Sequence, residues 1–148
     1  MTKYFEDFPA GATFDCGSFS FTEDQILTFA TAYDPQRFHV DKDAAKDTIY
    51  GGLIASGWHT ASQAMRQVVD HLFGEAAAMG SPGLTELSWK KPVRAGDHLR
   101  VRLSIENARK LASKPNLGIT NQLIEVLNDE DEVVLQWRAA VMFATKPA

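Results

Sequence analysis

The last two fifths of the chain are dominated by alternation of apolar and polar residues. Four runs show it, at residues 84–90, 98–108, 117–127 and 132–145. A period of two predicts strands with one buried face. The clearest run, HLRVRLSIENA, places on one face Leu99, Val101, Leu103 and Ile105. Because short connections such as the turn-forming NDED join the runs, they predict an antiparallel sheet.

One long helix is predicted immediately before this sheet, over residues 51–74. Its apolar residues recur at helical spacing and form one wide face, made of Ile54, Trp58, Ala61, Met65, Val68, Val69 and Leu72. A helix of about 20 residues is about 30 Å long, enough to cross a small domain. One helix against one sheet is a two-layer α+β architecture, and we expect a single domain over residues 1–148.

The first third of the chain predicts a strand and two shorter helical segments. ATFDCGSFSF alternates and predicts a strand, and TEDQILTFATAY predicts a helix in which Thr22 and Gln25 form a capping box. This helix should end at Asp34, because the next residue is proline. Residues 41–47 predict a short helical turn, whereas residues 75–83 fit either a helix extension or a loop.

Composition narrows the functional classes. The net charge of -4 disfavours nucleic-acid binding, although Lys90, Lys91 and Arg94 are candidates for a local basic patch. No segment approaches the roughly 18 consecutive apolar residues of a membrane span. The start of the chain lacks the apolar run of a secretory signal, and the single cysteine, Cys16, is expected in the core. These features predict a cytoplasmic protein with no membrane or nucleic-acid partner.

The segment DPQRFHVD holds the strongest candidates for chemistry. Asp34 and His39 are five residues apart, so a helix would point them about 140° apart and a strand would place them on opposite faces. An irregular loop constrained by Pro35 can bring them together. Carboxylate and imidazole exchange protons near neutral pH, which suggests acid–base catalysis. A metal site including Asp41 is disfavoured, because only one histidine lies nearby.

The start of the long helix is the second candidate feature. Early helical N–H groups lack intrahelical partners and favour negative charge, so the Gly57 N–H could stabilise an oxyanion. Glycine would also let a substrate approach closely, although Gly57 could equally serve close packing of helix on sheet. His59 is expected to be structural or solvated.

The stretch from residue 21 to residue 58 resembles the MaoC-like dehydratase, or (R)-specific enoyl-CoA hydratase, family. The family pattern is roughly T-x-x-x-[IV]-x-x-[FY]-A-x-x-x-x-D-x-N-P-x-H-x-D, followed by a glycine-rich approach to a long helix. The later segment LSWKKPVRAGDHLRVRLSIENAR is also similar to the family. The resemblance covers about residues 8 to 144. It implies the hotdog fold, in which an antiparallel sheet wraps around a long central helix.

The resemblance also implies the site and the reaction. Asp34, His39 and Gly57 take the catalytic positions, with Asp34 as the main base on a water, His39 orienting that water and helping to deliver a proton, and the Gly57 N–H holding the thioester carbonyl. Expected substrate-binding residues are Gln36, Arg37, Gly52 and Ser56. The substrate would be an acyl-CoA thioester, with no metal or other cofactor, and the protein a homodimer or higher homo-oligomer.

Three residues depart from the family pattern. Gln36 and Arg37 replace the usual Asn and Pro, and Ser56 stands where His or Pro often precedes the glycine. Gln36 keeps an amide, and Arg37 adds a charge that would meet coenzyme A or face water. Two alternatives therefore remain open: an acyl-CoA thioesterase, and a non-catalytic acyl-CoA-binding subunit.

Overall fold

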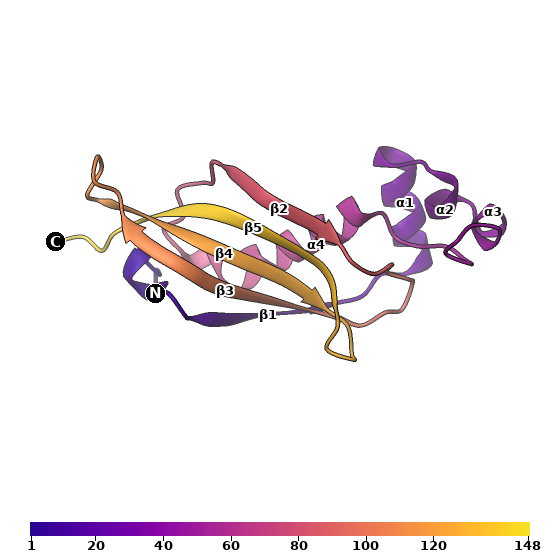
Figure 1. The fold of residues 1–148 in the computed structure, drawn as a ribbon, viewed down its shortest axis with the longest axis horizontal. Helices are drawn as coiled ribbons and strands as arrows, with labels where there is room; N and C mark the ends of the chain where they lie inside the picture. The colour runs from indigo at the N-terminus through magenta and orange to yellow at the C-terminus, as the bar shows by residue number, and fades with distance from the viewer.

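A five-stranded antiparallel sheet packs on one central helix, α4 (Gly57–His71) (Figure 1). This computed structural model describes residues 1–148. The strand order is β1-β3-β4-β5-β2, and the strands are β1 (Thr13–Phe19), β2 (Gly83–Trp89), β3 (Leu99–Lys110), β4 (Leu117–Leu127) and β5 (Val133–Ala144). The two-layer α+β architecture predicted from the alternating runs is therefore confirmed.

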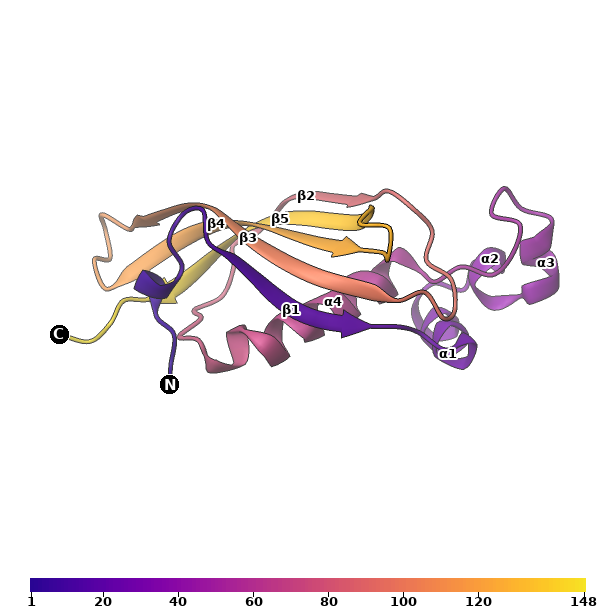
Figure 2. The ribbon, with the colours of Figure 1, turned by 90° about the horizontal axis from the view of Figure 1, so that it is seen from below.

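The core lies between the sheet and α4, where the sheet curves over the helix (Figure 2). The predicted inward face of β3 is confirmed, because all four of its apolar side chains are at most 2% exposed. On β5 the alternate residues from Leu135 to Phe143 are buried in the same way. Cys16 of β1 is fully buried, as expected for a core residue, and burial raises the pKa of its thiol to about 11.

Helix α4 is shorter than predicted, with 15 residues. Residues 51–56 do not join it because their backbone bonds to other segments. The Ile54 N–H donates to the Phe38 carbonyl at 3.0 Å, and the Ala55 N–H donates to the Val93 carbonyl at 2.8 Å. Hydrophobic periodicity could not show that this apolar segment is held in an extended form by its neighbours.

The buried face of α4 also differs from the predicted apolar stripe. Its buried residues are Thr60, Ala64, Gln67 and Val68. Three residues of the predicted stripe are exposed instead, namely Trp58 (56%), Met65 (40%) and Val69 (38%). The sheet of one chain covers only part of the apolar surface of this helix. The rest faces outward, and Trp58 meets Trp89 of β2 there.

Three short helices gather at one end of the molecule (Figure 1): α1 (Glu23–Tyr33), α2 (Arg37–Val40) and α3 (Lys42–Lys46). The predicted capping box of α1 and the Asp41 cap of α3 are both present. The prediction of an irregular loop from Asp34 to His39 is wrong in part, because His39 lies on the single turn of α2. Only residues 34–36 are irregular, and they reverse the chain between two helices.

Two single turns of 3-10 helix, η1 (Phe5–Asp7) and η2 (Phe73–Glu75), complete the elements. The sequence of residues 75–83 fitted either a helix extension or a loop. After η2 this segment is extended: Ala76 forms a bridge with Lys3, and Ala78 forms one with Phe143. No helix in the structure combines the length and the apolar character that crossing a bilayer requires.

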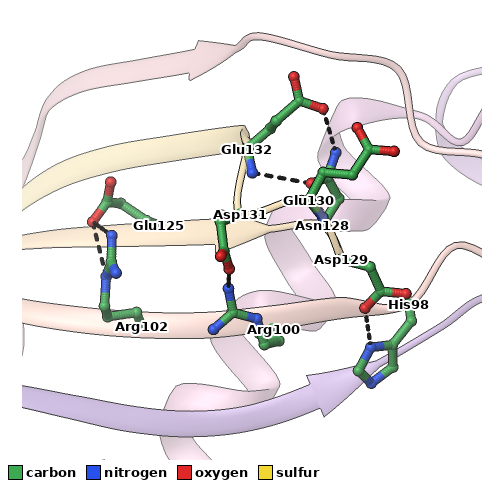
Figure 3. A network of polar contacts seen from close by, with 9 residues as sticks. All are labelled: His98, Arg100, Arg102, Glu125, Asn128, Asp129, Glu130, Asp131 and Glu132. Atoms are coloured by element: carbon green, nitrogen blue, oxygen red, sulfur yellow. Dashed lines mark hydrogen bonds and ion pairs between the residues drawn. The ribbon is translucent and has the colours of Figure 1, made fainter.

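Polar contacts fix the predicted turn between β4 and β5 (Figure 3). The Asn128 side chain accepts hydrogen bonds from two backbone N–H groups of the turn, those of Glu130 and Glu132. Ion pairs join the turn and β4 to β3: Arg100 with Asp131, and Arg102 with Glu125. The His98 ring, just before β3, lies 2.8 Å from the Asp129 carboxylate. Exposed pairs contribute little stability, so their main effect is to hold the turn in place.

Core packing predicts different effects for two substitutions on β3. Leu103→Ala removes a fully buried side chain and should lower the free energy of unfolding by about 2–5 kcal/mol. Arg109→Ala on the same strand is exposed and should change it by less than about 0.5 kcal/mol. Urea denaturation of both variants measures the difference. Equal effects would contradict the assignment of the core.

Candidate active site

Asp34 and His39 lie next to each other at the bend between α1 and α2. The His39 Nε2 atom is 3.3 Å from Oδ2 of Asp34, and the two side chains are 6% and 16% exposed. Because residues 34–36 reverse the chain, the directions that a single helix or strand would impose do not apply. The predicted proximity of the two side chains is therefore what the structure shows.

A backbone carbonyl fixes the orientation of the His39 ring. Its Nδ1 atom lies 2.8 Å from the carbonyl oxygen of Ile54, which belongs to the extended segment before α4. A carbonyl only accepts, so Nδ1 carries the proton and donates. In the neutral ring, Nε2 is then an unprotonated acceptor beside the Asp34 carboxylate. Two acceptors side by side suit a water molecule that donates one hydrogen to each.

The Asp34 carboxylate is held by two further donors. Gln36 Nε2 donates to Oδ1 at 2.7 Å, and Ser56 Oγ donates to Oδ2 at 2.7 Å. Burial raises the pKa of Asp34, but these hydrogen bonds and the neighbouring His39 outweigh it, so the pKa lies below its ordinary value. Asp34 is consequently ionised at neutral pH.

Gly57 is the first residue of α4 and lies beside the Trp89 indole. A Cβ atom at position 57 would overlap the Trp89 indole, so only glycine allows this approach. The Gly57 N–H has no intrahelical acceptor at the first helical position, and it donates to no other group of the chain. It is therefore free to bind an oxygen atom of a ligand.

These groups share one cavity of about 410 Å³. Asp34, Gln36, His39 and Gly57 line it together with apolar and aromatic side chains of α2, α4, β5 and the segment after β2. The arrangement offers a pair of acceptors for a water, a free N–H for an oxyanion, and apolar and aromatic side chains that can contact an apolar ligand. Such a cavity suits proton transfer to and from an apolar chain that carries a carbonyl group.

The structure places two of the four expected substrate-binding residues at the site and two outside the cavity lining. Gln36 lines the cavity and also orders Asp34, as its retained amide allows. Ser56 is fully buried and contacts the site through Asp34, whereas Arg37 and Gly52 are not among the lining residues. Arg37 is exposed at the start of α2.

Several lining residues were not predicted from the sequence. They include two tryptophans, a threonine and the end of the segment after β2: Trp58, Thr60, Trp89, Lys90, Lys91 and Val93. Lys90 and Lys91 stood out only as a basic patch, and Lys91 pairs with Glu132 of the turn in Figure 3. The only sequence signal for these residues was the KKPV segment. Its position over the cavity could not be predicted, because it depends on the pairing of β2 with β5.

Two other predicted residues lie outside this arrangement. Asp41 accepts hydrogen bonds from the first N–H groups of α3, and no three His, Cys, Asp or Glu side chains group as metal ligands would. His59 stacks between Phe21 and Phe29, with centroid distances of 3.8 and 4.5 Å. Burial lowers its pKa, and its packing between the two rings agrees with the expected structural role.

Known proteins share this fold, and some share a quarter to a third of this sequence. A crystal structure of a MaoC-like dehydratase from Rhodospirillum rubrum superposes with a TM-score of 0.90 at 35% identity, over 98% of this chain and 99% of that chain. The uncharacterised protein YdeM of Bacillus subtilis is 26% identical, over 93% of this chain and 96% of its own. The R-hydratase PhaJ1 of Pseudomonas aeruginosa superposes with a TM-score of 0.75 at 22% identity, over 98% and 88%.

The fold and the sequence family are thereby established. A sheet wrapped around one helix in this order is the hotdog fold, as the resemblance implied. The sequence profile of the MaoC-like domain matches residues 8–127, which is most of the chain and includes Asp34, His39 and Gly57. The chain therefore belongs to the MaoC-like dehydratase domain family.

Proposed function

We propose that the protein is an (R)-specific 2-enoyl-CoA hydratase, which also catalyses the reverse dehydration of 3-hydroxyacyl-CoA. The observation that carries this proposal is the 3.3 Å approach of His39 Nε2 to Asp34 Oδ2 on a cavity that Gly57 also lines. The (R) configuration follows the similarity to PhaJ1. Family membership supports a hydro-lyase reaction in general.

In the proposed mechanism, Asp34 and His39 hold one water by its two hydrogens. The water oxygen bonds to C3 of the enoyl thioester while one of its protons passes to Asp34. The low pKa of Asp34 favours passing this proton on, through His39 Nε2, to C2. The double bond is replaced by a C3–O bond and a C2–H bond, and both catalytic side chains return to their starting states.

The Gly57 N–H stabilises the negative charge that develops on the thioester oxygen when water adds to C3. One such donor is typically worth about 10²–10³-fold in rate. The α4 N-terminus adds a favourable dipole at the same point. The proposed reaction needs no metal or redox cofactor, and coenzyme A enters as part of the substrate.

Removing either proton-transfer group should abolish most of the activity. Asp34→Asn and His39→Gln should each slow hydration of crotonyl-CoA by roughly 10²–10⁴-fold, because each loses a positioned proton transfer. The loss of enoyl absorbance measures the rate. The matched variants Asp43→Asn and His98→Gln change exposed residues outside the cavity and should keep the wild-type rate.

The same samples decide between hydration and the alternatives. Full activity in Asp34→Asn or His39→Gln would rule out the proposed roles. Release of free thiol without loss of the double bond would identify a thioesterase instead. Binding of acyl-CoA in calorimetry, with no turnover of any enoyl thioester by the wild type, would identify a non-catalytic binding protein.

The hydrogen bond from Ser56 predicts a pH effect. Its loss in Ser56→Ala destabilises the ionised carboxylate, so the pKa of Asp34 should rise. Because the folded pKa lies below the unfolded one, stability from ionised Asp34 is present above the unfolded pKa of about 3.9 and is lost as pH falls through the folded pKa. Ser56→Ala should therefore lose less stability than the wild type between about pH 6 and pH 3.

A titration of the Asp34 carboxyl carbon by NMR measures the pKa directly, and denaturation at the two pH values measures the stability. An Asp34 pKa that is unchanged or lower in Ser56→Ala would contradict this account of its electrostatics.

We also propose a homodimer, formed through β2 and the exposed side of α4. β2 is an edge strand with exposed Leu84 (54%) and Trp89 (48%). Trp89 meets Trp58 of α4 at a ring distance of 5.2 Å, so the apolar surfaces of the two elements are continuous. An unpaired strand edge flanked by large apolar side chains favours pairing with a second copy.

Leu84→Glu should convert this dimer into a monomer, because a carboxylate would be desolvated near the start of the paired edge. Light scattering should give twice 16.4 kDa for the wild type and 16.4 kDa for the variant. Ile49→Glu, which changes an exposed apolar residue after α3, should remain dimeric. A monomeric wild type would refute the proposed dimer.

A further inference from the structure

The cavity has an aromatic lining that the proposed water addition does not use. Besides the His39 ring, four aromatic side chains belong to its lining residues, and they form two pairs. Phe38 of α2 and Tyr50, which follows α3, have ring centroids 5.3 Å apart. Trp58 of α4 and Trp89 of β2 have ring centroids 5.2 Å apart. Two separate aromatic clusters therefore border the cavity.

Each pair adjoins a different catalytic group. The Phe38 ring meets the His39 ring at a centroid distance of 4.5 Å and an interplanar angle of 80°. The Trp89 indole lies against Gly57. In the proposed reaction, the thioester carbonyl is bound at Gly57 and C3 lies at the water that His39 holds. The carbons beyond C3 therefore continue from the His39 side of the cavity, where Phe38 and Tyr50 lie. This orientation rests on the proposed hydratase function.

Phe38 and Tyr50 are suited to contact a ligand. Both residues are half-buried, so the rest of the chain does not close them off. Their backbones are fixed, since the Phe38 carbonyl accepts a hydrogen bond from the Ile54 N–H and the Tyr50 carbonyl accepts one from Arg94. Side chains that are already ordered lose little conformational entropy when a ligand binds. Unlike the two tryptophans, these two residues lie outside the proposed dimer surface.

We propose that Phe38 and Tyr50 determine specificity by selecting acyl chains that carry an aryl group beyond C3. An aromatic ring has a negative face and a positive edge, so a second aromatic ring packs against it more favourably than its buried area alone predicts. The preferred substrates are 2-enoyl-CoA thioesters with a phenyl ring at C5 or C6. Two or three methylene groups between C3 and the ring let it pass His39 and keep it out of conjugation with the double bond.

The test compares substrates that differ only in whether the terminal ring is aromatic. The pairs are 5-phenyl-2-pentenoyl-CoA with 5-cyclohexyl-2-pentenoyl-CoA, and 6-phenyl-2-hexenoyl-CoA with 6-cyclohexyl-2-hexenoyl-CoA. In at least one pair, the wild type should favour the phenyl member by roughly 2- to 12-fold in kcat/KM, the range that an aromatic pair adds to area burial. A wall that only buries apolar surface would favour the cyclohexyl member instead.

Substitutions assign the preference to the two rings. Phe38→Leu and Tyr50→Leu keep an apolar side chain and should each reduce the preference, and the double variant should abolish it. Tyr50→Phe keeps the ring and should retain it. Tyr33→Leu, which replaces an exposed aromatic residue outside the cavity, should also retain it. Because Phe38 contacts His39, its loss also affects the overall rate, and the ratio within each pair removes that effect.

A binding measurement separates this inference from the proposed reaction. Calorimetry with the saturated analogues 5-phenylpentanoyl-CoA and 5-cyclohexylpentanoyl-CoA, and with the corresponding hexanoyl pair, requires no turnover. If these bind but no enoyl thioester is hydrated, the hydratase proposal fails, and the ratio of Kd values within each pair still decides the role of the two rings. A ratio that favours phenyl in neither pair, a ratio unchanged in the double variant, or no binding of any analogue would overturn the inference. Thermal melts confirm that each variant is folded.

Discussion

The hydrogen bond between the His39 ring and the Ile54 carbonyl is the constraint on which the site depends. It joins α2 to the extended segment that leads into α4, and it leaves Nε2 facing Asp34. Without this bond the ring could rotate, and the paired acceptors would be lost. The Ile54 carbonyl is available because the Ile54 backbone is held by Phe38 and has not entered the helix.

The catalytic groups come from two layers of the fold. Asp34 and His39 belong to the short helices at one end of the molecule, whereas Gly57 begins the central helix (Figure 1). Ser56 connects them, since its buried hydroxyl donates to Asp34 one residue before the free N–H of Gly57. Trp89 of β2 closes the cavity over that glycine. The geometry therefore depends on packing between helices and sheet.

Much of the fold could be predicted because its signals are local. The alternation of β3 and β5, the capping box of α1 and the Asp41 cap of α3 all depend on neighbours within a few residues. The prediction for α4 was less accurate, both in its start and in its buried face. Val69 is as apolar as Val68, so periodicity could not tell which of the two the sheet covers.

The sequence by itself determined the order of the helices and strands, the spacing of apolar residues in each, and the pairing of a carboxylate with an imidazole across a proline bend. Only the tertiary structure decided the tautomer of His39, the lowered pKa of Asp34, and the burial of the Thr60 hydroxyl without a hydrogen-bond partner. The physical reason is the separation along the chain of the residues that interact. Helix caps and strand patterns depend on adjacent residues, whereas burial and hydrogen bonding in the cavity depend on residues that are tens of positions apart in the chain.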